Sequence, residues 1–390
     1  MTLVTMHALY QKGIKFDFTT CVKPKNNDNK KLEYTYGSKI ASIIDKAEKI
    51  NILRSLEGSA IDRIIEKGNY DITINTHGDT LPFYHPSFSK NNAITYCHFP
   101  SAKYHIDSEN LEYLRDIRVA NSLKIADIEF FSKDNKIVAN LLDPPTAKKI
   151  KRYFELLKHK YESLMKNTLV LTNSQYTSRV ISNLFNIHPE ILYPPVDIET
   201  FREIALNSAK REDVVLVISR IAPDKQIENA IEVGRILREK GGIGKEGMVI
   251  AGNLHHYDYG YYQQLKNMIA DFGLSNYIRL KPNISFSKLV QLMQMAKVYF
   301  HPRIDEHFGI SIVEAMASGL LPVVSNVGGH IEFVPSKYHF CTLDQAADII
   351  ALAFEAPGSE RRDISNSVTR FSNAEYIKSF HLILSELLTK

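Results

Sequence analysis

Short apolar runs alternate with longer amphipathic segments along most of the 390-residue chain. The runs Asp71–Asn75, Val214–Ser219 and Met248–Ala251 have the length of buried strands. Between such runs, segments such as Gln226–Lys240 have apolar residues at helical spacing. Because strands that alternate with helices are joined by crossovers, this pattern predicts an α/β fold with parallel sheets.

The alternation falls into two series. They are separated by Tyr193-Pro194-Pro195, a segment that can neither continue a helix nor lie within a central strand. A chain of this length also suits two hydrophobic cores better than one. We therefore predict Rossmann-like domains at residues 1–195 and 196–365, with a helix in residues 366–390 that packs back towards the first domain.

The residues that open the chain do not fit the usual start of a doubly wound domain. Thr2–Lys12 has helical spacing and Ile14–Thr20 alternates like a strand. Lys39–Ser55 again has helical spacing, which predicts a second helix. Such a domain normally begins with a strand and a glycine-rich turn before its first helix. We therefore expect the first domain to lack its first strand and glycine loop, unless that strand lies upstream.

Composition excludes several classes of protein. The net charge of +4, from 48 basic and 44 acidic residues, does not suggest a nucleic-acid partner. The three cysteines form no CxxC pair, so they suggest neither a metal site nor a disulfide framework, and a reducing compartment is expected. No apolar run approaches the roughly 20 residues that span a bilayer, and no signal peptide is visible. We expect a cytoplasmic protein.

The segment Lys148–Lys166 is a basic amphipathic helix with two interpretations. It could bind anionic lipid head groups, which would give peripheral contact with the cytoplasmic face of a membrane. The interpretation that we favour is a solvated charged face, which is the more common role of such a surface.

The segment Arg303–Gly319 contains a loop and the start of a helix, directly after a predicted strand. The backbone N–H groups of Gly309, Ile310 and Ser311 would lie at the helix N-terminus, where they can bind a phosphate. A glycine at the first of these positions lets a ligand approach the backbone closely. The segment therefore predicts a phosphate site.

Two carboxylates accompany this helix start. Glu306 precedes the helix and Glu314 lies in its predicted first turn, so one could accept hydrogen bonds from a sugar and the other from a ribose. Ser311 and Glu314 also have the spacing of a capping box, which needs no ligand. Both interpretations of that pair stay open here.

Two cations lie in another strand-to-helix loop. Arg220 and Lys225 precede the helix Gln226–Lys240, where positive charge opposes the helix macrodipole. That placement is easier to understand if both side chains bind an anion such as a diphosphate. The alternative for Lys225 is an ordinary solvated lysine.

Together these segments resemble the retaining glycosyltransferases of family four. The Glu-x7-Glu motif of that family is matched by Glu306 and Glu314, and its Arg and Lys by Arg220 and Lys225. The resemblance implies the GT-B fold, in which two Rossmann-like domains face each other across a cleft. It covers about Val214–Val334 well and the first domain more weakly.

The segment Asn283-Ile284-Ser285, followed by Glu306 to Ile310, is similar to Alg11-type mannosyltransferases of lipid-linked oligosaccharide synthesis. The family implies a role for each matched residue. Asn283 and Ile284 would lie near the base, and Glu314 would bind the ribose. The diphosphate would be held by both cations and the backbone at Gly309, Ile310 and Ser311. Glu306 would bind the transferred sugar.

The acceptor side is matched by Tyr96 to Pro100, in which His98 would face the sugar, as a histidine does in related enzymes. Without the resemblance, a histidine at a strand end is more often a structural residue whose hydrogen bonds are made within the protein. Asp79 could orient an acceptor hydroxyl, but a turn role for Gly78-Asp79 is an equal alternative.

The resemblance implies transfer of a hexose, mannose or glucose, from a GDP or UDP sugar to a hydroxyl of a glycan, with a lipid-linked oligosaccharide as the family-level acceptor. Family members react on one face of the sugar, so we expect retention and no carboxylate nucleophile. Because the cations neutralise the diphosphate, we expect neither metal nor other cofactor. A sugar-nucleotide epimerase and a donor-binding subunit without activity remain the alternatives.

Overall fold

The structure is a computed structural model that describes residues 1–20, 42–53, 58–77, 92–115, 144–207, 211–241 and 247–388. The described chain divides into two compact units. The first contains the described residues up to 192 together with 380–388, and the second contains residues 193–379. The boundaries predicted from sequence lie after residues 195 and 365. Each unit has its own buried apolar cluster.

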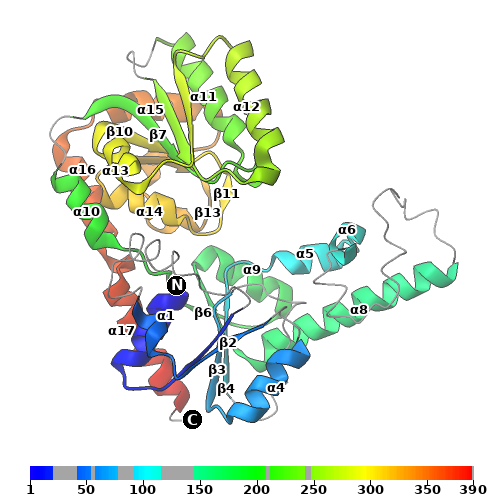
Figure 1. Cartoon of the computed structure of the whole chain (residues 1–390). Helices are drawn as coiled ribbons and strands as arrows, with labels where there is room; N and C mark the ends of the chain where they lie inside the picture. Colours follow the sequence, from blue (N-terminus) through cyan, green and yellow to red (C-terminus); the bar gives the residue numbers. More distant parts are fainter. Residues whose placement is uncertain are drawn as a thin grey trace. The chain divides into compact units, whose positions relative to one another are not determined.

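The first unit contains a four-stranded parallel sheet of order β3-β4-β5-β6 and a separate parallel pair, β1-β2. Its strands are β1 (Asp17–Thr20), β2 (Lys49–Ile52), β3 (Ile72–Asn75), β4 (Asn92–Cys97), β5 (Leu169–Thr172) and β6 (Glu190–Ile191). Its helices are α1 (Thr2–Gln11), the 3-10 helix η1 (Ser42–Lys46), α4 (Gly58–Gly68), α5 (Ser101–Asp107), α6 (Leu111–Arg115), α8 (Pro144–Asn167) and α9 (Gln175–Phe185) (Figure 1). The predicted helix at Thr2–Lys12 and the strand that follows it are confirmed.

The predicted helix over Lys39–Ser55 is wrong where the structure describes it. Residues 42–46 form only the short helix η1, and Lys49–Ile52 form β2, which pairs in parallel register with β1. The isoleucines that gave helical spacing belong to two elements: Ile43 and Ile44 are buried in η1, whereas Ile50 lies in the strand. Pairing with β1 satisfies the backbone of this segment and overrides the local pattern.

Helix α8 confirms the basic amphipathic prediction. Its residues Phe154, Leu157, Tyr161 and Leu164 are buried in the core of the first unit, while most of its lysines are exposed. Apolar residues at this spacing form one stripe along a helix, which packs on the sheet. No helix in the described ranges is long and apolar enough to cross a membrane.

Helix α9 begins with a serine cap. The Ser174 hydroxyl accepts a hydrogen bond from the Thr177 backbone N–H at 3.0 Å and thereby caps the helix. The last helix of the chain, α17 (Asn373–Leu388), contributes its C-terminal turns to the first unit, where His381 Nε2 lies 2.7 Å from the carbonyl oxygen of Ala8 in α1.

The second unit contains a six-stranded sheet of order β14-β12-β10-β7-β8-β9 in which every neighbouring pair is parallel. Its strands are β7 (Glu212–Ile218), β8 (Met248–Gly252), β9 (Ile278–Pro282), β10 (Ala296–Phe300), β12 (Leu321–Ser325) and β14 (His339–Phe340). The chain starts in the centre at β7, runs outward to β9, returns to β10 and runs outward the other way. This is the strand order of a doubly wound nucleotide-binding domain.

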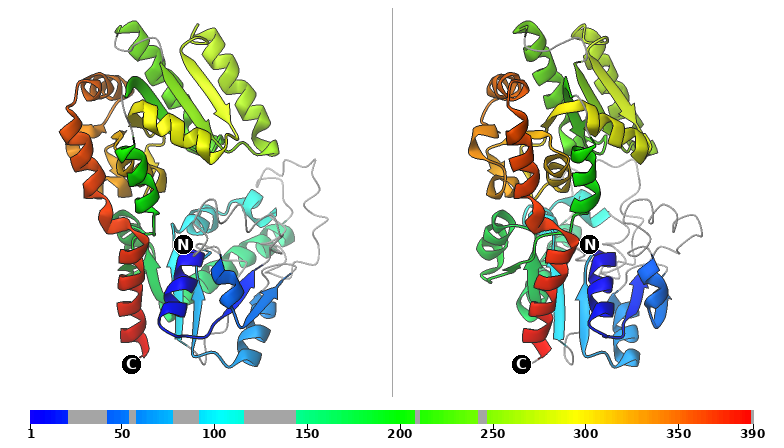
Figure 2. Two further views of the ribbon diagram at one scale, coloured as in Figure 1. Left: turned by 60° about the vertical axis from the view of Figure 1, so that its left-hand side comes forward. Right: turned by 90° about the vertical axis from the view of Figure 1, so that its left-hand side faces the viewer.

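Helices cover both faces of that sheet (Figures 1 and 2). They are α10 (Ile198–Leu206), α11 (Ile227–Glu239), α12 (Tyr259–Asp271), α13 (Phe286–Met295), α14 (Ile310–Ala317), α15 (Leu343–Phe354) and α16 (Gly358–Ser367). The crossovers β7-α11-β8 and β10-α14-β12 run in opposite directions, so right-handed connections place α11 and α14 on opposite faces. Accordingly, α11 packs against α12 and α15, whereas α14 packs against α10 and α16.

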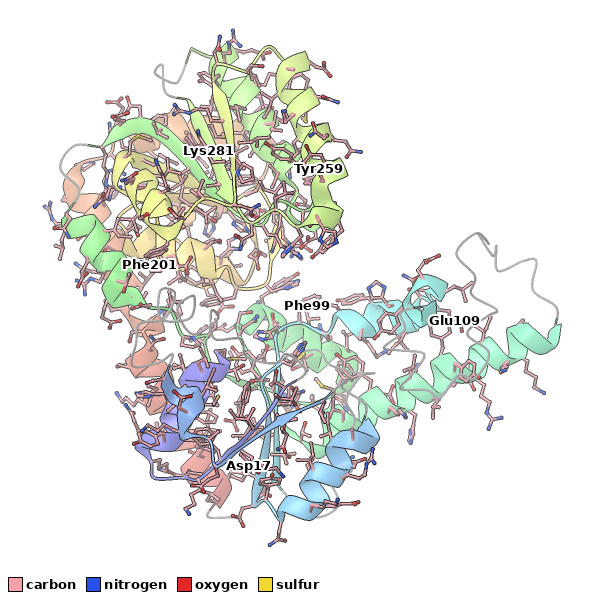
Figure 3. The ribbon with its side chains drawn as sticks, in the orientation of Figure 1. Asp17, Phe99, Glu109, Phe201, Tyr259 and Lys281 are labelled. Atoms are coloured by element: carbon pink, nitrogen blue, oxygen red, sulfur yellow. The ribbon has the colours of Figure 1, made fainter. Side chains whose placement is uncertain are left out.

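The core of the second unit follows from this two-sided cover. Val214–Val217 of β7 are fully buried, and a strand with helices on both faces reads as a continuous apolar run. On the α14 side, the rings of Phe201 in α10, labelled in Figure 3, and Phe286 in α13 meet edge to face with centroids 6.1 Å apart. The strands predicted at Val214–Ser219 and Met248–Ala251 and the helix predicted at Gln226–Lys240 are present as β7, β8 and α11, with ends that differ by one or two residues.

Candidate donor site

The two segments that carry the predicted chemistry lie at the carboxyl edge of the second unit's sheet. One follows β7 and leads into α11, and the other follows β10 and leads into α14. Because β7 and β10 are neighbours whose connections leave in opposite directions, their loops separate at this point of the edge. Ligands of open α/β sheets bind in the crevice that forms there.

Gly309 sets the geometry of the α14 start. It is the N-cap residue, with φ 94° and ψ 67° in the left-handed region, and no side chain caps the helix. A Cβ at this position would lie 2.4 Å from Ile312 Cδ1 and 3.3 Å from Glu306 Cγ, so glycine is required. The uncapped first turn, in which Ile310 is 47% exposed, leaves backbone N–H groups available for an anion.

The capping-box interpretation of Ser311 and Glu314 is wrong. The cap position belongs to Gly309, and the first turn of α14 holds no acidic residue. The Ser311 hydroxyl instead lies 2.9 Å from the Tyr299 hydroxyl of β10. Neither side chain caps the helix, and the Ser311 hydroxyl is partnered by Tyr299.

Glu306 and Lys225 meet across the two loops. Lys225 Nζ lies 3.4 Å from Glu306 Oε2, and His301 Nε2 lies 3.4 Å from the same oxygen. Burial alone would raise the pKa of the Glu306 carboxyl. The nearby His301, followed by Lys225 and Arg303, outweighs burial and holds that pKa well below its usual range. Glu306 is therefore a carboxylate at neutral pH.

A series of buried polar side chains contacts His301 and so supports the Glu306 carboxylate. The Tyr299 hydroxyl lies 2.9 Å from both His301 Nδ1 and the Ser311 hydroxyl, and it donates to the Ile218 carbonyl of β7 at 3.4 Å. Tyr299 and His301 are both buried. These hydrogen-bonded side chains thus connect β7, β10, the start of α14 and Glu306.

Backbone contacts also join the two loops. Gln226 Oε1 accepts a hydrogen bond from the Ile304 N–H at 2.9 Å, and Asn229 Nδ2 donates to the Pro302 carbonyl at 3.0 Å. Loops fixed by side chains of a packed helix hold their polar groups in place before a ligand arrives, which is the requirement for electrostatic preorganisation.

The segment after β12 holds the Glu306 loop from the other side. The two-residue strands β11 (Asp305–Glu306) and β13 (Val327–Gly328) pair in parallel, and the Ser325 hydroxyl donates to the Ile304 carbonyl. Gly328 has φ 130°, and a Cβ there would lie 2.3 Å from the Glu306 carbonyl oxygen. Only glycine allows this close approach.

The family model described as glycosyl transferases group 1 matches residues 198–368, which hold all the contacts described so far in this site. Residues 198–368 form a glycosyl transferases group 1 domain. The match agrees with the resemblance inferred from Glu306, Glu314, Arg220 and Lys225.

Curated relatives match somewhat more than half of this chain. The mouse protein named GDP-Man:Man(3)GlcNAc(2)-PP-Dol alpha-1,2-mannosyltransferase is 29% identical over 240 residues, which cover 57% of this chain and 49% of the mouse chain. The Xenopus laevis protein of the same name is 30% identical over 241 residues, with coverage of 57% and 49%. This chain therefore spans about half the length of the curated relatives that it matches.

Solved structures establish the fold. A glycosyltransferase from Rickettsia africae superposes with a TM-score of 0.64 at 15% identity, covering 99% of this chain and 94% of its own. Anabaena Alr3699/HepE in complex with UDP gives 0.59 at 15% identity, covering 96% and 100%. The predicted α/β class and GT-B fold are confirmed.

Arg220 does not reach Glu306 in the group 1 domain. Its Nη2 donates to both Asp224 carboxylate oxygens at 2.9 Å, in a pair that is about half exposed. Such an exposed pair contributes little to stability, so Arg220 can leave Asp224 and bind a phosphate at a small cost in free energy. The diphosphate role predicted for Arg220 requires that exchange.

Asn283 and Ile284 lie at the end of β9, two strands away from β7. Asn283 has φ 53°, and its side chain accepts from the Leu254 N–H at 2.9 Å and donates to the Leu254 carbonyl at 3.3 Å. Asn283 therefore shapes the loop after β8, and Ile284, which is partly buried, follows it. Their predicted place near the base stays a prediction.

Glu314 lies in α14, one turn beyond the uncapped N–H groups. Burial, followed by the charge of Asp197, raises the pKa of its carboxyl to about 8. At neutral pH the group is mostly protonated, so it can both donate to and accept from a hydroxyl.

We expect Glu314→Gln to change the pH dependence of stability. The folded-state pKa of about 8 exceeds the ordinary 4.5, so the folded chain holds the proton longer than the unfolded chain. The free energy of unfolding of the unmodified chain therefore falls as pH rises from about 4.5 to 8, by at most about 1.4 kcal/mol per pH unit. Glutamine removes this decline. Urea unfolding at pH 5, 7 and 8.5 should show a gap between the two proteins that widens with pH, and a constant gap would contradict the assignment.

The acceptor-side prediction, His98, lies in the first unit directly after β4. Its ring is 4.9 Å from the Tyr96 ring, and its carbonyl accepts a hydrogen bond from Asn173 at 2.8 Å. Burial, the chain's amino terminus and His77 lower its pKa to about 4, although a backbone contact with Thr76 opposes this, so the imidazole is neutral at pH 7. Asp79 lies outside the described residues.

Sequence reasoning missed His301, Gln226 and Gly328. His301 carried a usable signal, because a polar residue ends the buried strand that precedes the site. The contacts of Gln226 and Gly328 join residues far apart in the chain and had no such signal. In the described part of the chain, no three His, Cys, Asp or Glu side chains are grouped so that they could hold a metal ion.

Proposed function

We propose that this chain is a retaining glycosyltransferase that moves a hexose from a nucleoside diphosphate sugar to a hydroxyl of a glycan. One observation carries the proposal. The uncapped α14 start at Gly309, the ionised Glu306 and the cation Lys225 are held together at the switch point of a doubly wound sheet. A phosphate, a sugar hydroxyl and a leaving-group charge each find a matching partner there.

The diphosphate would bind at the first turn of α14. Backbone N–H groups of Ile310 and Ser311 would donate to it, and Lys225 and Arg220 would neutralise the charge that develops as the sugar leaves. These groups are supplied by the fold itself, so no metal or other cofactor is part of the proposal. Ile284, at the end of β9, would lie on the base side.

The hexose would lie against Glu306, whose carboxylate accepts hydrogen bonds from sugar hydroxyls. Glu314 would bind the ribose. Because Glu306 is paired with Lys225 and held by His301, it positions the sugar rather than attacking it. The acceptor hydroxyl would approach on the face from which the diphosphate leaves, and the leaving phosphate would take its proton, so the anomeric configuration is retained.

The donor we propose is GDP-mannose and the acceptor is a lipid-linked oligosaccharide. The support is the name of the mouse and Xenopus relatives, which specifies GDP-Man and Man(3)GlcNAc(2)-PP-Dol. His98, neutral at pH 7, would face the sugar from the acceptor side. An acceptor of this kind implies work at the cytoplasmic face of a membrane, with α8 as the candidate for peripheral contact.

The test is a transfer assay on the full chain with radiolabelled GDP-mannose or UDP-glucose and a dolichol-linked oligosaccharide. We expect label to enter the acceptor from GDP-mannose in an α-linkage, with EDTA present and with turnover absent when the acceptor is omitted. Conversion of the donor alone would identify an epimerase. Binding of GDP without any transfer would identify a donor-binding subunit, and either result would contradict the proposal.

A further inference from the structure

Tyr299 is the central residue of the hydrogen-bonded side chains that reach Glu306. Its side chain is fully buried, and its hydroxyl lies 2.9 Å from both His301 Nδ1 and the Ser311 hydroxyl. His301, which is 2% exposed, has its other ring nitrogen, Nε2, 3.4 Å from Glu306 Oε2. We call Ser311, Tyr299 and His301 the Tyr299 network. Because Tyr299 is fully buried, any effect that it has on transfer must act through its neighbours.

The charge of Glu306 determines which nitrogen of His301 carries a proton. A carboxylate only accepts hydrogen bonds, so it repels a bare Nε2 and attracts a protonated one. Nε2 is buried and makes no hydrogen bond within the described residues, so Glu306 is the acceptor open to its proton. Lys225 Nζ, 3.4 Å from the same carboxylate oxygen, already balances the charge of Glu306. A second, buried positive charge on His301 would be uncompensated and costly, so His301 is neutral with its proton on Nε2.

This proton position fixes the direction of the other hydrogen bonds in the Tyr299 network. A neutral imidazole with its proton on Nε2 has only an acceptor at Nδ1. Tyr299 therefore donates to Nδ1 and shares that proton with the longer contact to the Ile218 carbonyl at 3.4 Å. Burial raises the pKa of Tyr299 far above its usual range, so its hydroxyl keeps the proton that it donates. The Ser311 hydroxyl in turn donates to the Tyr299 oxygen.

We propose that Tyr299 and Ser311 are positioning residues for the transferred sugar, which hold the His301 ring with its Nε2–H towards Glu306. The inference rests on the proposed function, in which Glu306 accepts hydrogen bonds from the sugar. The partner of one ring nitrogen of a histidine sets what the other nitrogen presents, and the Tyr299 hydroxyl is that partner here. Ser311 lies in the first turn of α14, beside the N–H groups assigned to the diphosphate, so the network joins the two halves of the donor site.

Nitrogen NMR of the chain with isotope-labelled histidine tests the proton position without any donor or acceptor present. We expect His301 to show a protonated Nε2 and an unprotonated Nδ1 that accepts a hydrogen bond. The signals that disappear in His301→Gln identify the residue, and its Nδ1 signal should shift in Tyr299→Phe. A protonated Nδ1 would overturn the proposal, because Tyr299 could then not donate to it.

Transfer kinetics test the positioning role. Tyr299→Phe keeps the ring and removes the hydroxyl, so kcat should fall by about tenfold, within the usual range for coupled neighbours of one network. The affinity for GDP, which has no sugar, should change by no more than about threefold. Added to Glu306→Gln, the same substitution should lower kcat by no more than about threefold further, since the network acts through that carboxylate. An equal loss in both backgrounds would show that Tyr299 only packs the core, and the proposal would be wrong.

Tyr277→Phe is the matched control. Tyr277 precedes β9 at the opposite edge of the same sheet, and among the described residues its buried hydroxyl has no hydrogen-bond partner, so its removal should leave kcat unchanged. If Tyr299→Phe does not fold, Ser311→Ala should show the same dependence on Glu306. A chain with the expected proton position that transfers no sugar would contradict the proposed function and the positioning role with it. A protonated Nδ1 in a chain that transfers sugar would overturn this inference alone.

Discussion

Replacing Glu306 by glutamine should lower the kcat for transfer from GDP-mannose by about 10²- to 10³-fold, the usual loss when one preorganised electrostatic group is removed from an active site. The carboxylate is held ionised by His301, Lys225 and Arg303, and it is the acceptor we assign to the sugar hydroxyls. An amide of the same size keeps the packing but loses the charge. The affinity for GDP, which lacks the sugar, should change by no more than about threefold.

The adjacent carboxylate supplies a matched control. Asp305 is exposed and pairs with Arg303 at 3.1 Å rather than with Lys225. Asp305→Asn should leave kcat within about threefold of the unmodified chain. Transfer rates at saturating donor measure both variants, and equal losses in the two would show that the loop, rather than the Glu306 charge, determines the rate.

Replacing Gly309 by alanine should weaken GDP binding by at least about tenfold. The left-handed backbone at this position costs a residue with a Cβ about 1–2 kcal/mol, and the Cβ would lie 2.4 Å from Ile312 Cδ1. The helix start must then shift, which moves the N–H groups that we assign to the diphosphate. Since about 1.4 kcal/mol corresponds to tenfold in affinity, the backbone cost alone corresponds to roughly five- to thirtyfold, and the close approach to Ile312 adds to it.

Gly260, near the start of α12, is the control for that substitution. A Cβ there meets nothing within 4 Å, so Gly260→Ala should bind GDP as the unmodified chain does. Calorimetric titration with GDP measures both variants. An unchanged affinity in Gly309→Ala would show that the diphosphate does not use the α14 start.

Much of the second unit could be predicted because its signals are local. The fully buried strand at Val214–Val217 is a continuous apolar run. The loop-to-helix segment at Gly309 was found in the same way. Each of these features depends on residues that are close together in the sequence.

The errors came from features that depend on distant partners. The capping box at Ser311 failed because Tyr299, twelve residues earlier, binds its hydroxyl, and because the left-handed Gly309 takes the cap position. The helix predicted over Lys39–Ser55 is wrong because part of this segment pairs with β1 as a strand. The environment of Glu306 depends on Lys225, 81 residues away, and no local pattern encodes that contact.

The central claim is that a nucleoside diphosphate binds at the uncapped start of α14, next to Lys225. Calorimetric titration of the unmodified chain with GDP and with GMP tests it most directly. We expect GDP to bind at least tenfold more tightly than GMP, because only the second phosphate reaches the N–H groups beyond Gly309. Equal affinities for the two nucleotides, or no binding of either, would contradict it.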